Sequence, residues 1–254
     1  MRLDAALVKR GLASSRADAV ELIATGNVVV AGSFADKASR MVGADEPIQV
    51  LAVKKFVSRG GEKLWHALES FAIDVTDRSV CDAGASTGGF TDCVLQRGAR
   101  RVLALDVGRN QLHEHLKNDP RVTWHDGVNV RELDRDRMDF PCSLAVVDLS
   151  FISLTKVLAA LVASLSREPA HPVAELVLLV KPQFEAGRSE VSKGRGVIVD
   201  PEVHRGAVET VRTCAESLGC TVESVVESPI KGAEGNTEFL MWVKCPGDSV
   251  GYGS

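Results

Sequence analysis

Blocks of apolar residues alternate with amphipathic segments over most of the chain, and this pattern predicts repeated strand–helix units. Short apolar runs without a helical period predict five buried strands, at 80–82, 101–106, 122–124, 143–151 and 175–182. Segments with helical character lie between or after them, at 62–71, 91–97, 111–117, 155–165 and 203–218. Buried strands separated by helices predict an α/β fold, in which an open and mostly parallel sheet has helices on both faces.

Two further strands are expected near the C-terminal end, at 221–226 and 238–244. The segment 228–232 lies before the last of them, contains Pro and Gly, and is too short for a crossover helix. We therefore expect a hairpin here, with the last strand antiparallel to its neighbour.

The first 53 residues follow a different pattern, with two short helices and then short strands. Residues 3–10 place apolar side chains on one helical face, and Ser14 or Ser15 caps a second helix that stops at Gly26. Short strands are expected at 27–32 and 47–53. The chain is thus divided into a small α+β domain at 1–53, a linker at 54–59, the α/β domain at 60–246 and a tail at 247–254.

A glycine-rich turn follows the first strand of the α/β domain, and a helix follows the turn. Such a unit lets a ligand approach the backbone closely and rest on a helix N-terminus. The glycine spacing differs from that of dinucleotide and phosphate-binding loops, and Asp82 would repel a diphosphate. A nucleoside that carries an ammonium group suits this acid, and S-adenosylmethionine is such a ligand; a tightly packed turn without a ligand is the alternative. The candidate cofactor contacts here are Asp82, Gly84, Ala85, Ser86, Gly88, Gly89 and Phe90.

The second and third strands add further cofactor candidates. Asp106 ends the second strand about twenty residues beyond the glycines, where a doubly wound sheet places the carboxylate that binds a ribose diol. The adjoining Val107 is expected to contact the same ligand. After the third strand, either Asp126 or Asn129 is a candidate acceptor for an adenine amine, with a plain polar turn as the alternative.

Chemistry is expected at the carboxyl ends of the strands, where ligands of such sheets bind. Asp148 and Lys181 fall at two of these ends, and a lysine is the less ordinary residue there. A buried lysine beside a second cation can act as a general base. Lys63 is the candidate second cation, and Asp148 and Glu238 are candidates to hold the two amines. Taken singly, Lys63 is typical of a surface charge at a helix start and Glu238 of an ion-pair partner at a strand edge.

Composition narrows the functional classes. Residues 1–63 hold ten basic and seven acidic side chains, net +3, in a chain of net charge −4, and this weakly indicates a polyanionic partner. Six cysteines without a C-x-x-C pair indicate reduced thiols, and the scattered histidines suggest no metal site. No apolar run is long enough to span a bilayer, and no signal-peptide core begins the chain. We expect a cytoplasmic monomer with no membrane or metal partner.

Basic residues gather around the two N-terminal helices and continue into the linker, and each alone is typical of a solvated surface charge. As candidate phosphate contacts they are Arg2, Lys9, Arg10, Arg16, Lys55 and Arg59. The pattern from Arg2-Leu3-Asp4 through Arg10-Gly11-Leu12 and Ser14-Ser15-Arg16 to Gly32 resembles a small RNA-binding domain first described in a ribosomal protein of the small subunit. The resemblance implies structured RNA as the ligand.

The α/β domain also resembles a known family. The carrying motifs are Ser58-Arg59-Gly60-x-x-Lys63, Asp82-Ala83-Gly84-Ala85-Ser86-Thr87-Gly88-Gly89-Phe90, Asp148-Leu149-Ser150-Phe151, Lys181-Pro182-Gln183-Phe184-Glu185 and Gly235-Asn236-x-Glu238. They are similar to the TlyA group, FtsJ-like ribose 2′-O-methyltransferases with an N-terminal RNA-binding domain. Ala233 departs from the pattern, because relatives often have Pro there.

This resemblance implies a Rossmann-like methyltransferase sheet, S-adenosylmethionine as the cofactor, and cytidines of ribosomal RNA within ribosomal subunits as the substrate. FtsJ-like enzymes use a Lys-Asp-Lys-Glu tetrad with a lysine as general base. By motif, the tetrad falls on Lys63, Asp148, Lys181 and Glu238, with Lys181 as the base.

Two other functions compete with methyl transfer. Members of the family have been labelled haemolysins, but the sequence has neither a long apolar segment nor a strongly amphipathic, membrane-facing one. A non-catalytic RNA-binding or ribosome-assembly factor would keep the cofactor fold without turnover. All four tetrad positions are filled, and this favours an enzyme.

Overall fold

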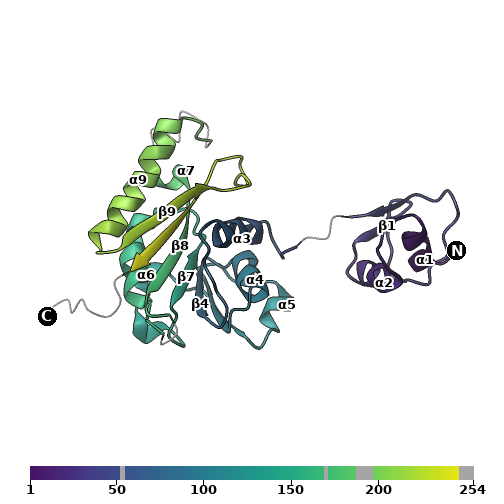
Figure 1. Ribbon diagram of the computed structural model, residues 1–254, viewed down its shortest axis with the longest axis horizontal. Helices are drawn as coiled ribbons and strands as arrows, with labels where there is room; N and C mark the ends of the chain where they lie inside the picture. The colour runs from purple at the N-terminus through teal and green to yellow at the C-terminus, as the bar shows by residue number, and fades with distance from the viewer. Residues whose placement is uncertain (52–54, 169–170, 187–196, 246–254) are drawn as a thin grey trace. The chain divides into compact units, whose positions relative to one another are not determined.

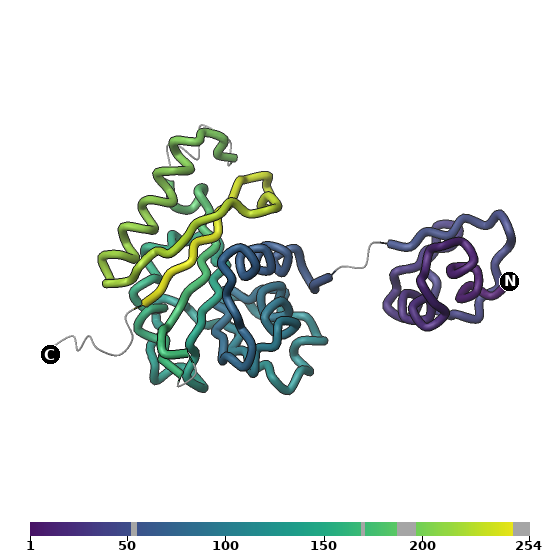
Figure 2. Tube along the Cα trace, viewed as in Figure 1, coloured from purple at the N-terminus to yellow at the C-terminus, as the bar shows by residue number. Residues whose placement is uncertain are grey.

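The computed structural model describes residues 1–51, 55–168, 171–186 and 197–245, and the chain divides into two compact units (Figure 1, Figure 2). The first unit ends at Lys55 and the second begins at Phe56. The tail expected at 247–254 and residue 54 of the expected linker lie outside the described residues. Phe56, from the segment expected as a linker, is 3% exposed and packs in the core of the second unit.

The N-terminal unit is a small α+β domain, as predicted. Helices α1 (Leu3–Lys9) and α2 (Arg16–Ala24) share one hydrophobic core with an antiparallel sheet of order β2-β1-β3. Its strands are β1 (Val28–Val30), β2 (Ser33–Phe34) and β3 (Ile48–Val50). The Ser15 side chain accepts a hydrogen bond from the Asp18 backbone N–H, so Ser15 is the predicted cap of α2.

The second unit is built on a seven-stranded sheet of order β6-β5-β4-β7-β8-β10-β9. Its strands are β4 (Ser79–Ala83), β5 (Arg101–Asp106), β6 (Val122–Asp126), β7 (Leu144–Val147), β8 (Ala174–Val180), β9 (Thr221–Glu227) and β10 (Phe239–Cys245). Strands β4 to β8 pair in parallel, whereas β10 pairs antiparallel with both β8 and β9. The predicted mostly parallel sheet with a reversed last strand is confirmed.

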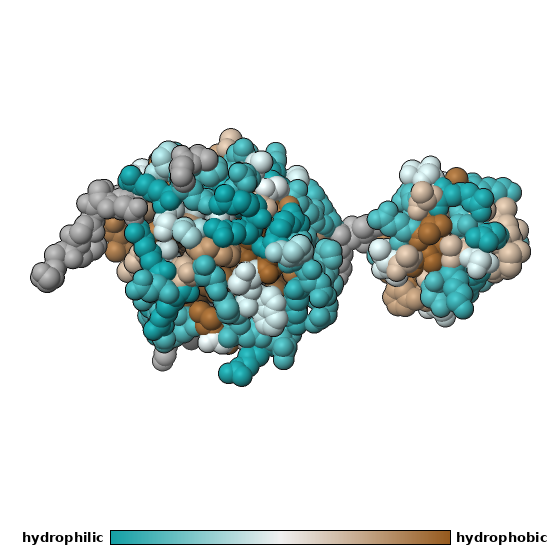
Figure 3. Space-filling view, turned by 90° about the horizontal axis from the view of Figure 1, so that it is seen from below, coloured by the Kyte–Doolittle hydropathy of each residue, from teal (hydrophilic) through white to brown (hydrophobic). Residues whose placement is uncertain are grey.

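Helices cover both faces of this sheet (Figure 1). Along β7, Leu144 and Val146 enter one hydrophobic core and Ala145 and Val147 enter the other, because successive side chains of a strand point to opposite faces. The first core includes α3 (Gly60–Ser70), α4 (Gly89–Gln96) and α5 (Glu114–Lys117), and the second includes α6 (Leu158–Ser164) and α9 (Pro201–Ser217). Polar residues cover most of the visible surface of each unit, with smaller apolar patches between them (Figure 3).

Some element boundaries differ from the predicted ones. The helix expected at 111–117 begins only at Glu114, because the His113 backbone N–H donates to the Thr87 carbonyl of the glycine-rich turn. The third strand extends to Asp126 and places that acid at a strand end. The helix expected at 155–165 is preceded by a separate short turn of 3-10 helix, Leu154–Lys156, whose start the Ser153 side chain caps.

Candidate active site

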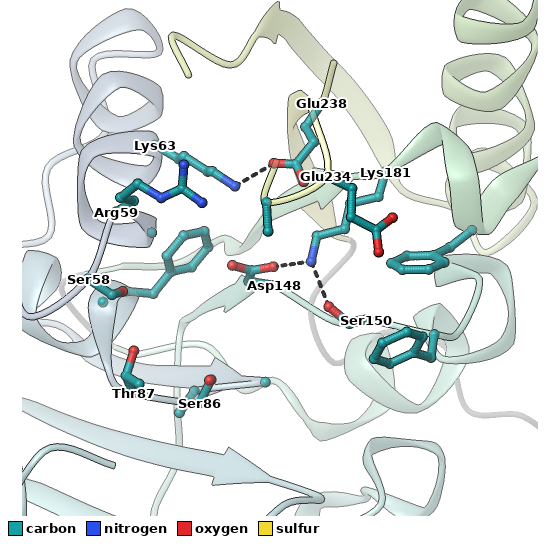
Figure 4. Close-up of a pocket in the computed structure, with 18 of the residues that line it drawn as sticks. Ser58, Arg59, Lys63, Ser86, Thr87, Asp148, Ser150, Lys181, Glu234 and Glu238 are labelled. Atoms are coloured by element: carbon teal, nitrogen blue, oxygen red, sulfur yellow. Dashed lines mark hydrogen bonds and ion pairs between the residues drawn. The ribbon is translucent and has the colours of Figure 1, made fainter. Parts of the chain in front are cut away.

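Four charged side chains from different elements surround one cavity of about 420 Å³ (Figure 4). The Nζ atom of Lys181 lies 2.6 Å from Oδ1 of Asp148, and Nζ of Lys63 lies 2.5 Å from Oε2 of Glu238. The structure therefore brings together all four side chains that the sequence singles out, as two amine–carboxylate pairs.

The topology of the sheet explains this convergence. Strands β7 and β8 are parallel neighbours, so Asp148 and Lys181 follow them at the same edge. Strand β10 runs in the opposite direction, and its first residue, Phe239, pairs with the last residue of β8, Val180. Glu238 therefore lies at this edge as well, although it precedes its strand.

The charges of the site are largely removed from water. The exposed fractions are 8% for Lys63, 8% for Lys181 and 3% for Glu238. A buried charge is tolerated when it is paired, whereas loss of one partner leaves the other uncompensated. Each amine of this site has its own carboxylate, so both ammonium groups can be kept inside the fold and held in fixed positions.

A second cavity of about 470 Å³ adjoins the first and shares Gly84, Ser86 and Asp148 with it. Gly84 has φ +90°, and a Cβ atom there would lie 2.5 Å from the Asp148 carbonyl oxygen. Only glycine allows this close approach of two backbone segments. The turn thus shapes the passage between the two cavities.

The second cavity has a lining that suits a nucleoside. Asp106 stands in it, with its carboxylate fixed by the backbone N–H groups of Ser86 at 2.7 Å and Gly108 at 2.6 Å. A carboxylate at this place can accept the hydroxyls of a ribose. Apolar side chains and one amide complete the lining, among them Val107, Val128, Leu149 and Asn129. The predicted Asp106, Val107 and Asn129 are thus together in one cavity.

Three of the predicted cofactor residues line neither of these cavities. Asp82 is fully buried beneath the turn, and its Oδ2 accepts a hydrogen bond from the Thr91 hydroxyl at 2.6 Å. Its Oδ1 has no partner among the described residues, and burial raises the pKa of Asp82 to about 7. Gly88 packs against Leu116, where a Cβ atom would lie 2.2 Å from its Cδ1. Asp126 accepts the Asn110 backbone N–H and lines a third cavity.

The predicted RNA-contacting residues have unequal surroundings. Arg2 and Arg16 both form ion pairs with the buried carboxylate of Asp4, at 3.0 and 3.1 Å, while their own side chains are at least half exposed. The Arg10 guanidinium instead donates to the carbonyl oxygens of Gly43, Ala44 and Glu46. Lys9 and Lys55 are exposed, and Arg59 lines the first cavity.

Several lining residues were not predicted from the sequence. Ser150 accepts a hydrogen bond from Lys181 Nζ at 3.0 Å, and the exposed ring of Phe151 lies against that of Phe184, with centroids 5.4 Å apart. Gln183 and Glu234 also face the first cavity. The only sequence signal for these residues was their position, because four of them lie two or three residues after Asp148 or Lys181 in the quoted motifs.

Over the described ranges of the chain, no helix has the length and apolar character needed to cross a membrane. In the same part of the chain, no group of three or more His, Cys, Asp or Glu side chains is placed to hold a metal ion.

The fold is Rossmann-like, and a match to a family model defines the class of the protein as a methyltransferase. In fold, the chain resembles a Listeria monocytogenes structure assigned to the S-adenosylmethionine-dependent methyltransferases, with a TM-score of 0.51 and 15% identity over 74% of this chain and 100% of that one. The FtsJ-like methyltransferase family model matches residues 56–245, and the S4 domain model matches residues 1–48.

Close relatives narrow this class. A Mycobacterium tuberculosis protein named 16S/23S rRNA (cytidine-2′-O)-methyltransferase TlyA is 45% identical over 97% of this chain and 91% of its own length. A haemolysin-labelled structure from Streptococcus thermophilus is 38% identical, with a TM-score of 0.72 over 99% of this chain and 92% of that one. The chain belongs to the TlyA group of the FtsJ-like methyltransferase family. The expected cofactor, S-adenosylmethionine, is confirmed as that of the family.

Proposed function

We propose that this protein methylates the ribose 2′-hydroxyl of a cytidine in ribosomal RNA, within ribosomal subunits, with Lys181 as the general base. The observation that carries the proposal is the pairing of Lys181 with Asp148 and of Lys63 with Glu238 around one cavity, next to a second cavity suited to a nucleoside. The name of the Mycobacterium tuberculosis relative supports the nucleotide and the RNA.

The cofactor belongs in the second cavity. Asp106 would bind the ribose hydroxyls, Asn129 would meet the base edge, and the turn from Gly84 to Gly89 would approach the amino-acid part. S-adenosylmethionine supplies an electrophilic methyl group when it is bound.

The first cavity is the proposed place of the target nucleotide. Lys181 Nζ removes the proton of the 2′-hydroxyl, and Asp148 holds that nitrogen in place. The Lys63–Glu238 pair forms the facing wall and positions a second amine near the ribose. Much of the rate gain is expected from this positioning. The nucleotide must leave its helix to enter, which requires a few kcal/mol.

The N-terminal unit is the proposed RNA-binding part. The S4 domain match supports structured RNA as its ligand, and the half-exposed guanidinium groups of Arg2 and Arg16 are available for phosphate oxygens. Arg59 would contact the RNA backbone at the first cavity itself.

The test is transfer of a tritiated methyl group from S-adenosylmethionine to purified small and large ribosomal subunits, assayed separately. Alkaline hydrolysis of the labelled RNA should leave one resistant linkage at a cytidine, because a 2′-O-methyl group blocks cleavage there. Lys181→Ala should abolish labelling and leave subunit binding intact. Lys244→Ala is the matched control, since Lys244 lies at the far end of β10 and pairs with Glu223.

Each outcome separates the alternatives. No label on either subunit from a folded, cofactor-binding protein would contradict the proposed activity and favour an RNA-binding assembly factor. Full labelling by Lys181→Ala would leave the activity standing and refute the role of Lys181.

A further inference from the structure

The Nζ atom of Lys181 has two hydrogen-bond acceptors. Asp148 Oδ1 lies 2.6 Å from Nζ and Ser150 Oγ lies 3.0 Å from it (Figure 4). The ring centroid of Phe184 lies farther off, at 5.9 Å. Ser150 is not one of the four tetrad positions, yet it bonds directly to the proposed base and lines both cavities.

The number of acceptors matters for a base. A neutral amine has two N–H bonds and one lone pair in a tetrahedral arrangement. With Asp148 as its sole acceptor, one N–H is held, but the second N–H and the lone pair can exchange between the two remaining tetrahedral positions. A second acceptor takes the second N–H and fixes the lone pair in the one remaining direction.

We propose that Ser150 is a positioning residue that, together with Asp148, directs the lone pair of Lys181 toward the ribose hydroxyl. The inference rests on the proposed role of Lys181 as general base. It assigns to the Ser150 hydroxyl an effect on the rate of proton removal and none on the binding of RNA or cofactor.

Ser150 needs an anchor of its own, because it lies beyond the end of β7 and the sheet does not hold it. The next residue, Phe151, has φ +65°, a conformation that non-glycine residues adopt only when their surroundings hold them there. The carboxylate of Glu185 supplies such a hold, since it accepts the Ser153 hydroxyl at 2.6 Å and the Leu154 backbone N–H at 2.8 Å.

Glu185 also belongs to the segment that carries the base. It ends the short helix α7 (Pro182–Glu185), whose N-cap is Lys181. Its two hydrogen bonds therefore tie the loop that holds Ser150 to the turn that follows Lys181. Glu185 is thus a second positioning residue, which acts through the loop and is not itself among the residues that line the first cavity.

The test compares initial rates of methyl transfer to ribosomal subunits at saturating and limiting substrate. Ser150→Ala should lower kcat about 10-fold, the effect of roughly one hydrogen bond, with KM for subunits and Kd for S-adenosylmethionine unchanged within about twofold. Ser150→Thr keeps the hydroxyl and should restore most of kcat. Ser217→Ala, on the exposed end of α9, is the matched control and should behave as the unmodified protein.

Variants of Glu185 test the anchor. Glu185→Ala should lower kcat by a factor similar to that of Ser150→Ala, whereas Glu185→Gln can still reach both partners and should retain most activity. The double variant Ser150→Ala/Glu185→Ala should be little slower than either single variant, because both remove the same alignment.

The outcomes distinguish a failure of the Ser150 role from a failure of Lys181 as the general base. If Lys181→Ala abolishes transfer while Ser150→Ala keeps full kcat, the base assignment stands and the positioning role is wrong. If Ser150→Ala raises KM or Kd at constant kcat, Ser150 is a binding residue and the inference is overturned. If Lys181→Ala itself retains full rate, the proposed base fails first. Ser150 is exposed, so its variants decide the matter even if Glu185→Ala does not fold.

Discussion

Replacement of Asp82 by Asn should change how the stability of the protein depends on pH. The Asp82 carboxyl is fully buried, and one of its oxygens has no hydrogen-bond partner among the described residues. Burial raises its pKa from 3.8 to about 7. The folded state therefore keeps a proton that the unfolded state releases, and stability falls as the pH rises through this window and levels off above about pH 7.

The magnitude follows from the two pKa values. A difference of about three pH units corresponds to about 4 kcal/mol of folding free energy when the window is fully crossed. Between about pH 4.5 and about pH 8, the carboxyl should remove roughly 3 kcal/mol of stability. Asn cannot ionise, and its oxygen can still accept the Thr91 hydroxyl. Its amide nitrogen would lack an acceptor, which costs about 1 to 3 kcal/mol at every pH.

The assay is urea unfolding of the unmodified protein and of Asp82→Asn at about pH 4.5 and about pH 8, without cofactor. The titration of all other groups cancels when the free energy of unfolding of one protein is subtracted from that of the other. This difference should shift by roughly 3 kcal/mol in favour of Asp82→Asn at the higher pH. Asp136→Asn, at an exposed position, is the control and should show no such shift. A difference that stays constant within about 0.5 kcal/mol would refute the buried, protonated state of Asp82.

Three further substitutions test the glycine turn and the N-terminal unit. Gly84→Ala should lower S-adenosylmethionine affinity at least about 10-fold in calorimetric titration, because a Cβ atom would meet backbone 2.5 Å away and widen the passage between the cavities. An unchanged affinity would contradict that account of the turn. Arg16→Ala should reduce the slope of log affinity for ribosomal RNA against log salt by about one, while Arg10→Ala should leave the slope unchanged, because the Arg10 guanidinium is bound to backbone carbonyl oxygens. Equal slopes for both variants would refute this distinction.

The sequence was sufficient for the sheet and for half of the candidate site. Buried apolar runs mark the strands, and an acid or a lysine at a carboxyl end must lie at the ligand-binding edge, so Asp148 and Lys181 could be found by position. Glu238 required the additional inference of a reversed last strand, which the short preceding loop supports. Lys63 could be named as a candidate second cation, but its local pattern is that of an ordinary helix start, and its place in the tetrad came from the family resemblance.

The site residues that the sequence could not reveal depend on contacts between distant segments of the chain. Ser150 lies in a loop, where apolar periodicity carries no information, and its bond to Lys181 exists only because two strands are neighbours. Asp82 and Arg10 show the same limit in reverse. Both were candidate ligand contacts because they are charged residues in or beside a motif. Asp82 is instead buried under the glycine turn, and Arg10 binds backbone carbonyl oxygens of a loop, because packing decides their partners.

The Lys63–Glu238 ion pair joins residues 175 positions apart, one near the beginning of the second unit and one at the start of its last strand. During synthesis, a ribosome completes the glycine turn and the parallel strands long before it adds Glu238. A chain that stops earlier has every residue that lines the second cavity, yet it lacks Glu238 and the strand β10, which lies between β8 and β9. The last wall of the first cavity and the strand that completes the sheet are therefore made in the same late step, because the residue after Glu238 begins β10.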